Sequence, residues 1–261
     1  MIKFASISPH PPILIPDIGK NNIELISDTK KSLEKLEAEY YQSKVDTIII
    51  ISPHGELAAD SFTINQAPEL EADFANFGDL KTKLNFKNDI GLGYQLREAL
   101  ETKLPVRLIS EPKLDHGTSV PLFYLASHLK DINILPIGYS LLPLKNHFEF
   151  GQQIYEIISQ KNKNIGIIAS GDLSHRLTPD APAGYSAAGK KFDEQLIQYL
   201  QNKETDKIIN LDKKLIEEAG ECGLRSIIIL LGILNNLNYQ TEILSYEGPF
   251  GVGYLVADFK I

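Results

Sequence analysis

The chain has 261 residues, of which 43% are hydrophobic and 23% charged, and its formal net charge is −8. A chain of this length can bury roughly three quarters of the surface that it exposes when unfolded, so it needs no cross-link for stability. Lys and Arg are scattered singly or in pairs without a basic stripe, which argues against nucleic acid or an anionic membrane as a partner.

Cysteine usage and the N-terminal segment suggest where the protein works. Cys222 is the only cysteine, so no disulfide can form within the chain, and we expect a reducing, cytoplasmic environment. The N-terminal sequence MIKFASISPHPPILIP is apolar, but its prolines and His10 argue against a signal peptide. No apolar run reaches the ~18 residues that a membrane span requires.

Short β-branched segments alternate with longer segments whose apolar residues recur every three or four positions. In chain order, this pattern predicts strand 2–8, helix 21–43, strand 45–51, helix 91–102, strand 105–109, helix 119–129, strand 132–138, helix 146–160, strand 164–169, helices 184–202, 204–219 and 224–236, and strands 241–245 and 252–258. The polar segment 56–90 is weakly periodic, and we interpret it as an excursion over the surface that contains a hairpin.

This alternation predicts an α/β protein with three layers, in which helices cover both faces of a central, mostly parallel but mixed sheet. The nearly continuous apolar runs 48–51 and 165–169 are typical of central strands that are buried on both faces. Since no linker, long repeat or low-complexity tract interrupts the sequence, we expect residues 1–261 to form a single domain.

The tetrapeptide ISPH occurs twice, and each copy places a histidine just after a predicted strand. His10 and His54 end these copies, His175 follows strand 164–169 in SGDLSH, and His116 precedes a helix in KLDHGTS. Ligands of open α/β sheets collect outside the carboxyl ends of the strands, so we expect these four side chains to converge. The other two histidines, His128 and His147, lie in or beside helices and are interpreted as solvent-facing or core-edge residues.

The segment EEAGECGLRSI, residues 217–227, brings acidic residues and Cys222 to a glycine-containing turn before a helix. A carboxylate at such a turn can join two histidines in a facial triad of the kind that binds non-haem Fe(II). Asp115 and Asp172 lie close to His116 and His175 in sequence, where they either orient a histidine ring or serve as a helix cap and a turn residue.

These motifs together resemble the class III extradiol dioxygenase (LigB-like) superfamily, and within it the Memo-like branch. The matching stretches are SISPHPPILIPDIG, IIISPHGE, LDHGTSVPLFYL, IASGDLSHRLTPDAPAGY, EEAGECGLRSIIILLG and SYEGPFGVGYLVA, from residue 6 to residue 257. The resemblance is greatest to the Memo-like module of a system that pairs Memo, AMMECR1 and radical-SAM proteins. It implies AMMECR1-like and radical-SAM partners, and it suggests self-association as a homodimer.

The resemblance to the dioxygenases implies a mononuclear metal site with His10, His54 and Glu221 as ligands. Fe(II) is the expected metal, with zinc or another divalent ion as the alternative. The family's acid/base histidines fall on His116 and His175. The reaction implied is opening of a catechol-like ring with O₂, in which a histidine takes a phenolic proton.

The resemblance to the Memo branch implies a different arrangement, in which Cys222 and His175 approach the metal. Glu221 and Cys222 are adjacent, so we expect only one of them to reach the metal, and we favour Glu221. A zinc site formed by His10, His54 and His175 is a further variant. Three roles are considered: a metal-dependent oxidoreductase, a metal-binding component that works with AMMECR1-like and radical-SAM partners, and a zinc hydrolase.

Overall fold

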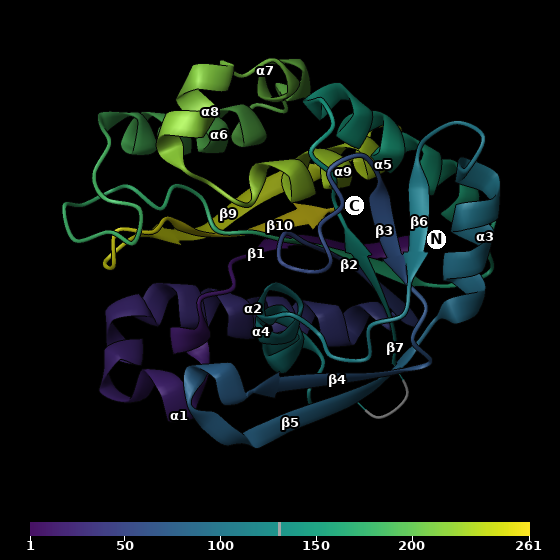
Figure 1. The fold of residues 1–261 in the computed structure, drawn as a ribbon, viewed down its shortest axis with the longest axis horizontal. Helices are drawn as coiled ribbons and strands as arrows, with labels where there is room; N and C mark the ends of the chain where they lie inside the picture. The colour runs from purple at the N-terminus through teal and green to yellow at the C-terminus, as the bar shows by residue number, and fades with distance from the viewer. Residues whose placement is uncertain (130–131) are drawn as a thin grey trace.

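The computed structural model describes residues 1–129 and 132–261. In this part of the chain ten strands form one mixed sheet (Figure 1). The strands are β1 (Ile2–Ser8), β2 (Thr47–Ser52), β3 (Phe62–Asn65), β4 (Glu69–Phe74), β5 (Asp79–Asn88), β6 (Val106–Ile109), β7 (Asn133–Gly138), β8 (Ile165–Ser170), β9 (Gln240–Glu247) and β10 (Tyr254–Lys260).

Helices connect most of these strands. They are α1 (Pro16–Gly19), α2 (Ser27–Ser43), α3 (Ile90–Leu100), α4 (His116–Leu125), α5 (Leu144–Ile158), α6 (Ala187–Gln201), α7 (Thr205–Ile209), α8 (Lys213–Ala219) and α9 (Leu224–Leu234), with 3-10 turns at Pro12–Leu14, Lys20–Ile26 and Ala75–Phe77. Within residues 1–129 and 132–261, no helix has the length and apolar content that a membrane crossing would require.

The sheet has a parallel centre and antiparallel edges. Its strand order is β4-β5-β7-β2-β8-β1-β10-β9, and β5, β7, β2, β8 and β1 are parallel to one another. Two strands pair with the same edge of β7. Strand β5 pairs parallel with its first residues, and β3 pairs antiparallel with its last residues. Strand β6 then pairs parallel with β3. The carboxyl ends of β1, β2 and β8 are therefore neighbours at one edge of the sheet.

Helices cover both faces of the sheet (Figure 1). One face packs against α3, α5, α6 and α9, and the other against α2 and α4, with β4 of the β4–β5 hairpin packing against α4. Strands β2 and β8 are fully buried because both of their faces meet these helical layers. The predicted α/β, three-layer architecture with a mostly parallel mixed sheet is confirmed.

Two predictions of local structure are wrong. Segment 56–90 contains the expected hairpin, formed by β4 and β5, but it is not a surface excursion because it contributes three strands to the sheet. Strand β3 is buried, since Phe62 and Ile64 pack into the core while Thr63 and Asn65 make hydrogen bonds. The predicted helix 204–219 is two helices, α7 and α8. Asp212 starts the second one as its N-cap, since its carboxylate accepts a hydrogen bond from the amide of Lys214.

Candidate metal and catalytic site

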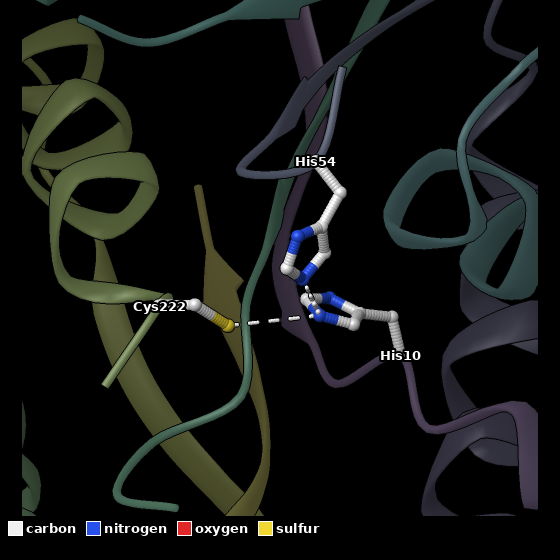
Figure 2. Close-up of side chains that lie close together, drawn as sticks. All are labelled: His10, His54 and Cys222. Carbon is white, nitrogen blue, oxygen red and sulfur yellow. Dashed lines mark hydrogen bonds between the residues drawn. The ribbon is translucent and has the colours of Figure 1, made fainter. Parts of the chain in front are cut away.

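Three side chains from separate parts of the chain meet where β1, β2 and β8 end. His10 follows β1, His54 follows β2, and Cys222 lies in the turn before α9. Figure 2 shows their side chains pointing toward one another. The Nε2 atoms of His10 and His54 are 3.0 Å apart, and Cys222 Sγ lies 3.6 Å from His10 Nε2. All three ligand atoms lie within 4.8 Å of one another.

Hydrogen bonds on the far side of His10 determine which of its nitrogens carries a proton. Ser170, the last residue of β8, donates its hydroxyl proton to the carbonyl oxygen of Gly117. Its Oγ must therefore accept the 2.9 Å hydrogen bond that it shares with His10 Nδ1. A neutral imidazole protonated at Nδ1 leaves the Nε2 lone pair free, and this lone pair points toward His54 and Cys222.

His54 is placed by contacts between the end of β2 and the start of α4. Ser52 donates its hydroxyl proton to Asp115 Oδ1 at 2.5 Å, and its Oγ accepts the amide hydrogen of His54. Asp115 also caps α4, because its carboxylate accepts the amide and hydroxyl hydrogens of Thr118. Gly117 permits this packing, since a Cβ there would lie 2.6 Å from Ser52 Oγ.

Asp172 connects the His10 loop to the Cys222 loop. Its carboxylate accepts the backbone N–H of His10 at 2.9 Å, and its own backbone N–H donates to Cys222 Sγ at 3.3 Å. Its carbonyl oxygen accepts the amides of Cys222 and Gly223. The two loops approach so closely that a Cβ on Gly171 would lie 2.1 Å from the Cα of Gly223. Asp172 thus fixes both neighbouring loops rather than forming a local turn.

Glu221 is directed to a different set of partners. Its Oε2 accepts the backbone N–H of Leu224 at 2.6 Å, and Oε1 lies 4.0 Å from Arg225. The carboxylate therefore serves the first turn of α9, where acidic groups are favoured. The structure places Cys222, and not the expected Glu221, beside the two histidines.

His116 lies against the cluster, and His175 influences it electrostatically. His116 is the first residue of α4, and its ring stacks on that of His54 with centroids 4.3 Å apart and planes 19° apart. The ring of Phe77, from the β4–β5 connection, makes an edge contact with the His116 ring at 5.3 Å between centroids. A charge on His175 would lower the pKa of both His10 and His54, so this residue lies near the cluster.

Burial keeps the four histidines neutral near pH 7. It lowers the pKa of His10 well below 6.5, with a further contribution from the charges of His54 and His116. It lowers the pKa of His54 to about 4, and it also lowers the pKa values of His116 and His175. Neutral imidazoles are the form that can ligate a metal or accept a proton.

The donor set fits a single divalent metal ion. Typical metal–nitrogen distances of about 2.0–2.1 Å and a metal–sulfur distance of about 2.3 Å, at tetrahedral angles, imply N···N and N···S separations of about 3.4 and 3.6 Å. The separations here are 3.0 and 3.6 Å. Burial raises the pKa of the Cys222 thiol, and a bound metal would counter this by favouring the thiolate.

A cavity of about 400 Å³ adjoins the cluster. It is bounded by the ends of β3 and β7 and by the segment that leads from β6 into α4, and His54 and Asp115 form part of its wall. His54 therefore belongs both to the cluster and to the wall of this cavity.

The remaining histidines lie apart from the site. His128 is exposed and its Nε2 lies 3.1 Å from Glu37. His147 is fully buried beside Tyr139, with both ring nitrogens facing backbone carbonyl oxygens. Sequence reasoning missed Ser170, although its position as the first residue of the SGDLSH segment that ends in His175 is a usable signal. It also missed Phe77, which comes from the segment interpreted as a surface excursion.

The architecture and site define an α/β protein with a candidate histidine and cysteine metal centre at the carboxyl ends of parallel strands. The chain belongs to the LigB family, whose description is the catalytic LigB subunit of aromatic ring-opening dioxygenase, and residues 4–257 match that family.

Similar proteins agree with this assignment. Protein CA_C1420 of Clostridium acetobutylicum is 35% identical over 256 residues, which cover 94% of this chain and 55% of that protein, so the chain spans about half the length of this relative. A 3,4-dihydroxyphenylacetate 2,3-dioxygenase of Escherichia coli is 24% identical over 225 residues, with 79% and 80% of the two chains covered. A crystal structure of the uncharacterized protein JW3007 from Escherichia coli shares the fold with a TM-score of 0.70 at 17% identity, covering 99% of this chain and 100% of that one.

Proposed function

We propose that this protein is a metal-dependent oxidoreductase that opens the ring of a catechol-like substrate with O₂. The observation that carries the proposal is the convergence of two imidazole nitrogens and one thiol, with a neutral third imidazole stacked beside them. Family membership and the similarity to a named dioxygenase support the same class of reaction.

His10, His54 and Cys222 would hold the metal. A divalent ion there would bind the phenolic oxygens and lower their pKa, and it would offer a position for O₂. Fe(II) is the metal that the proposed reaction requires. Imidazole and thiolate ligands also suit zinc, so metal content has to be measured before a reaction is assigned.

The chain's own residues would bind and deprotonate the substrate. His116 is neutral and borders the cluster, so it can accept a phenolic proton, while Phe77 beside it offers an aromatic surface to the substrate ring. His175 is the second candidate for proton transfer. Because both histidines stay neutral near pH 7, the site can act as a base without prior deprotonation.

Anaerobic loading with Fe(II), followed by exposure to O₂ and a panel of catechols, tests the proposal. Ring-opened products are expected, with turnover reduced by about 10²–10⁴-fold in His116→Gln while iron content is retained. An iron-loaded protein that opens none of the catechols would contradict the reaction but leave the metal site intact.

A second role is supported by one observation. Cys222 beside the histidines is the arrangement implied by the resemblance to the Memo branch, where the protein would be a metal-binding component beside AMMECR1-like and radical-SAM partners. We place this role second because the relatives reported above include a dioxygenase. Recovery of those two partners with the metal-loaded chain, in the absence of ring opening, would reverse the order.

A further inference from the structure

The cavity beside His54 has the size of a small-molecule site. Its volume of about 400 Å³ lies within the roughly 300–1,000 Å³ usual for such sites. Part of its wall is apolar, formed by Ile109, Leu114, Pro136 and Ile137. Since His54 belongs to both the cavity wall and the candidate metal centre, a substrate held at the centre has this space for its ring substituent.

Most polar side chains of the cavity wall already have partners within the protein. Ser52 and Thr118 both donate to the carboxylate of Asp115. Thr63 donates its hydroxyl proton to the carbonyl oxygen of Glu56, and the amide group of Asn65 bonds to the backbone on both its oxygen and its nitrogen. These groups fix the shape of the cavity but have little capacity left for a ligand.

Lys113, which supplies a positive charge to the cavity wall, forms an ion pair with Asp73. Lys113 Nζ lies 3.4 Å from Asp73 Oδ2, outside the cavity lining. A substrate carboxylate entering the cavity would have to compete with Asp73 for this ammonium group. It would also face the carboxylate of Asp115, so the cavity is poorly matched to an anionic substituent.

Two carboxylates remain for a ligand. Within residues 1–129 and 132–261, the side chain of Glu56 makes no hydrogen bond or ion pair, and Glu111 Oε1 accepts only a 3.4 Å hydrogen bond from the amide of Lys113. Both residues line the cavity from opposite segments, one after β2 and one after β6. An apolar wall bordered by two unpaired carboxylates matches a short hydrocarbon arm that ends in an ammonium group.

On the basis of the proposed function, we propose that the aromatic substrate carries an aminoalkyl substituent and that the cavity beside His54 receives it. The ammonium group binds between Glu56 and Glu111, while the alkyl carbons lie against Ile109 and Leu114. This substrate class differs in charge from the acid named in the Escherichia coli relative, 3,4-dihydroxyphenylacetate.

Binding to the metal-loaded full chain under anaerobic conditions tests this inference independently of turnover. The probes are dopamine, 3,4-dihydroxyphenylacetate and the uncharged 4-ethylcatechol, measured by titration calorimetry at low salt. We expect dopamine to bind about tenfold more tightly than the acid, because the two exposed carboxylates attract the ammonium group of dopamine and repel the carboxylate of the acid. The ratio should shrink as the salt concentration rises.

A double variant, E56Q with E111Q, identifies the carboxylates responsible. The dopamine-to-acid ratio should fall to within about twofold of unity, while 4-ethylcatechol normalises for any loss of folded protein. A matched control, E98Q with E149Q, removes the same two charges from exposed positions on α3 and α5 and should leave the ratio as in the wild type.

The outcomes separate this inference from the proposed function. Equal or tighter binding of the acid, an unchanged ratio in the double variant, or binding of none of the probes overturns the inference. A dopamine preference that depends on the two glutamates supports it, even if the iron-loaded protein opens no ring. A dopamine preference without ring opening would contradict the proposed reaction but still support an aminoalkyl ligand.

Discussion

Glu221 and Cys222 are adjacent in sequence, but their side chains contact different parts of the protein. Cys222 Sγ lies 3.6 Å from His10 Nε2, whereas the carboxylate of Glu221 binds the amide of Leu224 at 2.6 Å. The residue that was expected to complete a facial triad therefore stabilises a helix start, and its neighbour joins the histidines.

This separation predicts opposite effects of two substitutions on metal binding. Cys222→Ala should weaken metal binding by more than the roughly 10–100-fold that loss of an outer hydrogen-bond partner costs. Glu221→Gln should leave metal binding nearly unchanged, because the amide oxygen can still accept from Leu224. Metal content and competition with a chelator measure both. Loss of metal in Glu221→Gln, with metal retained in Cys222→Ala, would show that Glu221 rather than Cys222 is the third ligand.

The carboxylate of Asp172 should control the position of His10 in the metal site. Asp172→Ala removes the acceptor for the His10 amide, so we expect a loss of about 10–100-fold in metal affinity. Asp172→Asn retains an acceptor and should recover most of that loss. In the Co(II)-loaded protein, the sulfur-to-metal absorption band should shift in the alanine variant and return toward the wild-type position in the asparagine variant. Identical bands in all three proteins would show that the Asp172 carboxylate does not influence the geometry of the metal site.

The close contact of Gly171 with Gly223 predicts that neither loop tolerates a side chain there. In Gly171→Ala the new Cβ would lie 2.1 Å from the Cα of Gly223, so the Cys222 loop has to move. The expected cost is about 1–3 kcal/mol of unfolding free energy, together with weaker metal binding. Gly91→Ala is a matched control at the start of α3, where the nearest atom would be 3.9 Å away. Denaturant unfolding of both variants should show the difference.

Asp193 predicts a dependence of stability on pH. Its carboxylate is buried on α6 and accepts the amide of Ser174 and the hydroxyl of Tyr246, and burial raises its pKa from 3.8 to about 7. Because the folded state holds this proton more tightly, the contribution of Asp193 to stability is complete below about pH 4. It is lost as the pH rises to about 7, with a slope of at most about 1.4 kcal/mol per pH unit.

Comparison with Asp193→Asn isolates this effect, since asparagine keeps an acceptor and does not titrate. The unfolding free energy of the wild type relative to the variant should fall between pH 4 and 7 and then level off. The exposed substitution Asp180→Asn controls for removal of one negative charge. A difference that stays constant over this range would mean that Asp193 is ionised in the folded protein throughout it.

Patterns in the sequence were sufficient to predict the α/β architecture and the placement of two histidines after parallel strands. Short β-branched runs predicted seven of the strands. The signal is clear in β2 and β8, where burial on both faces leaves almost no polar residue. The repeated ISPH placed His10 and His54 after strands, and parallel strands bring such positions to one edge. Strand β5 was predicted only as part of an unplaced hairpin within 56–90, because exposed and half-buried residues alternate irregularly along it.

Which side chains meet at the candidate site depends on contacts between distant segments of the chain. The choice between Glu221 and Cys222 depends on how the turn before α9 passes Gly171 and Asp172, which lie about fifty residues earlier in the chain. The tautomer of His10 likewise depends on Ser170 and Gly117, which belong to two other elements. Local sequence carries the propensity of each segment, whereas these contacts arise from packing between segments that are distant in sequence, and no local pattern encodes them.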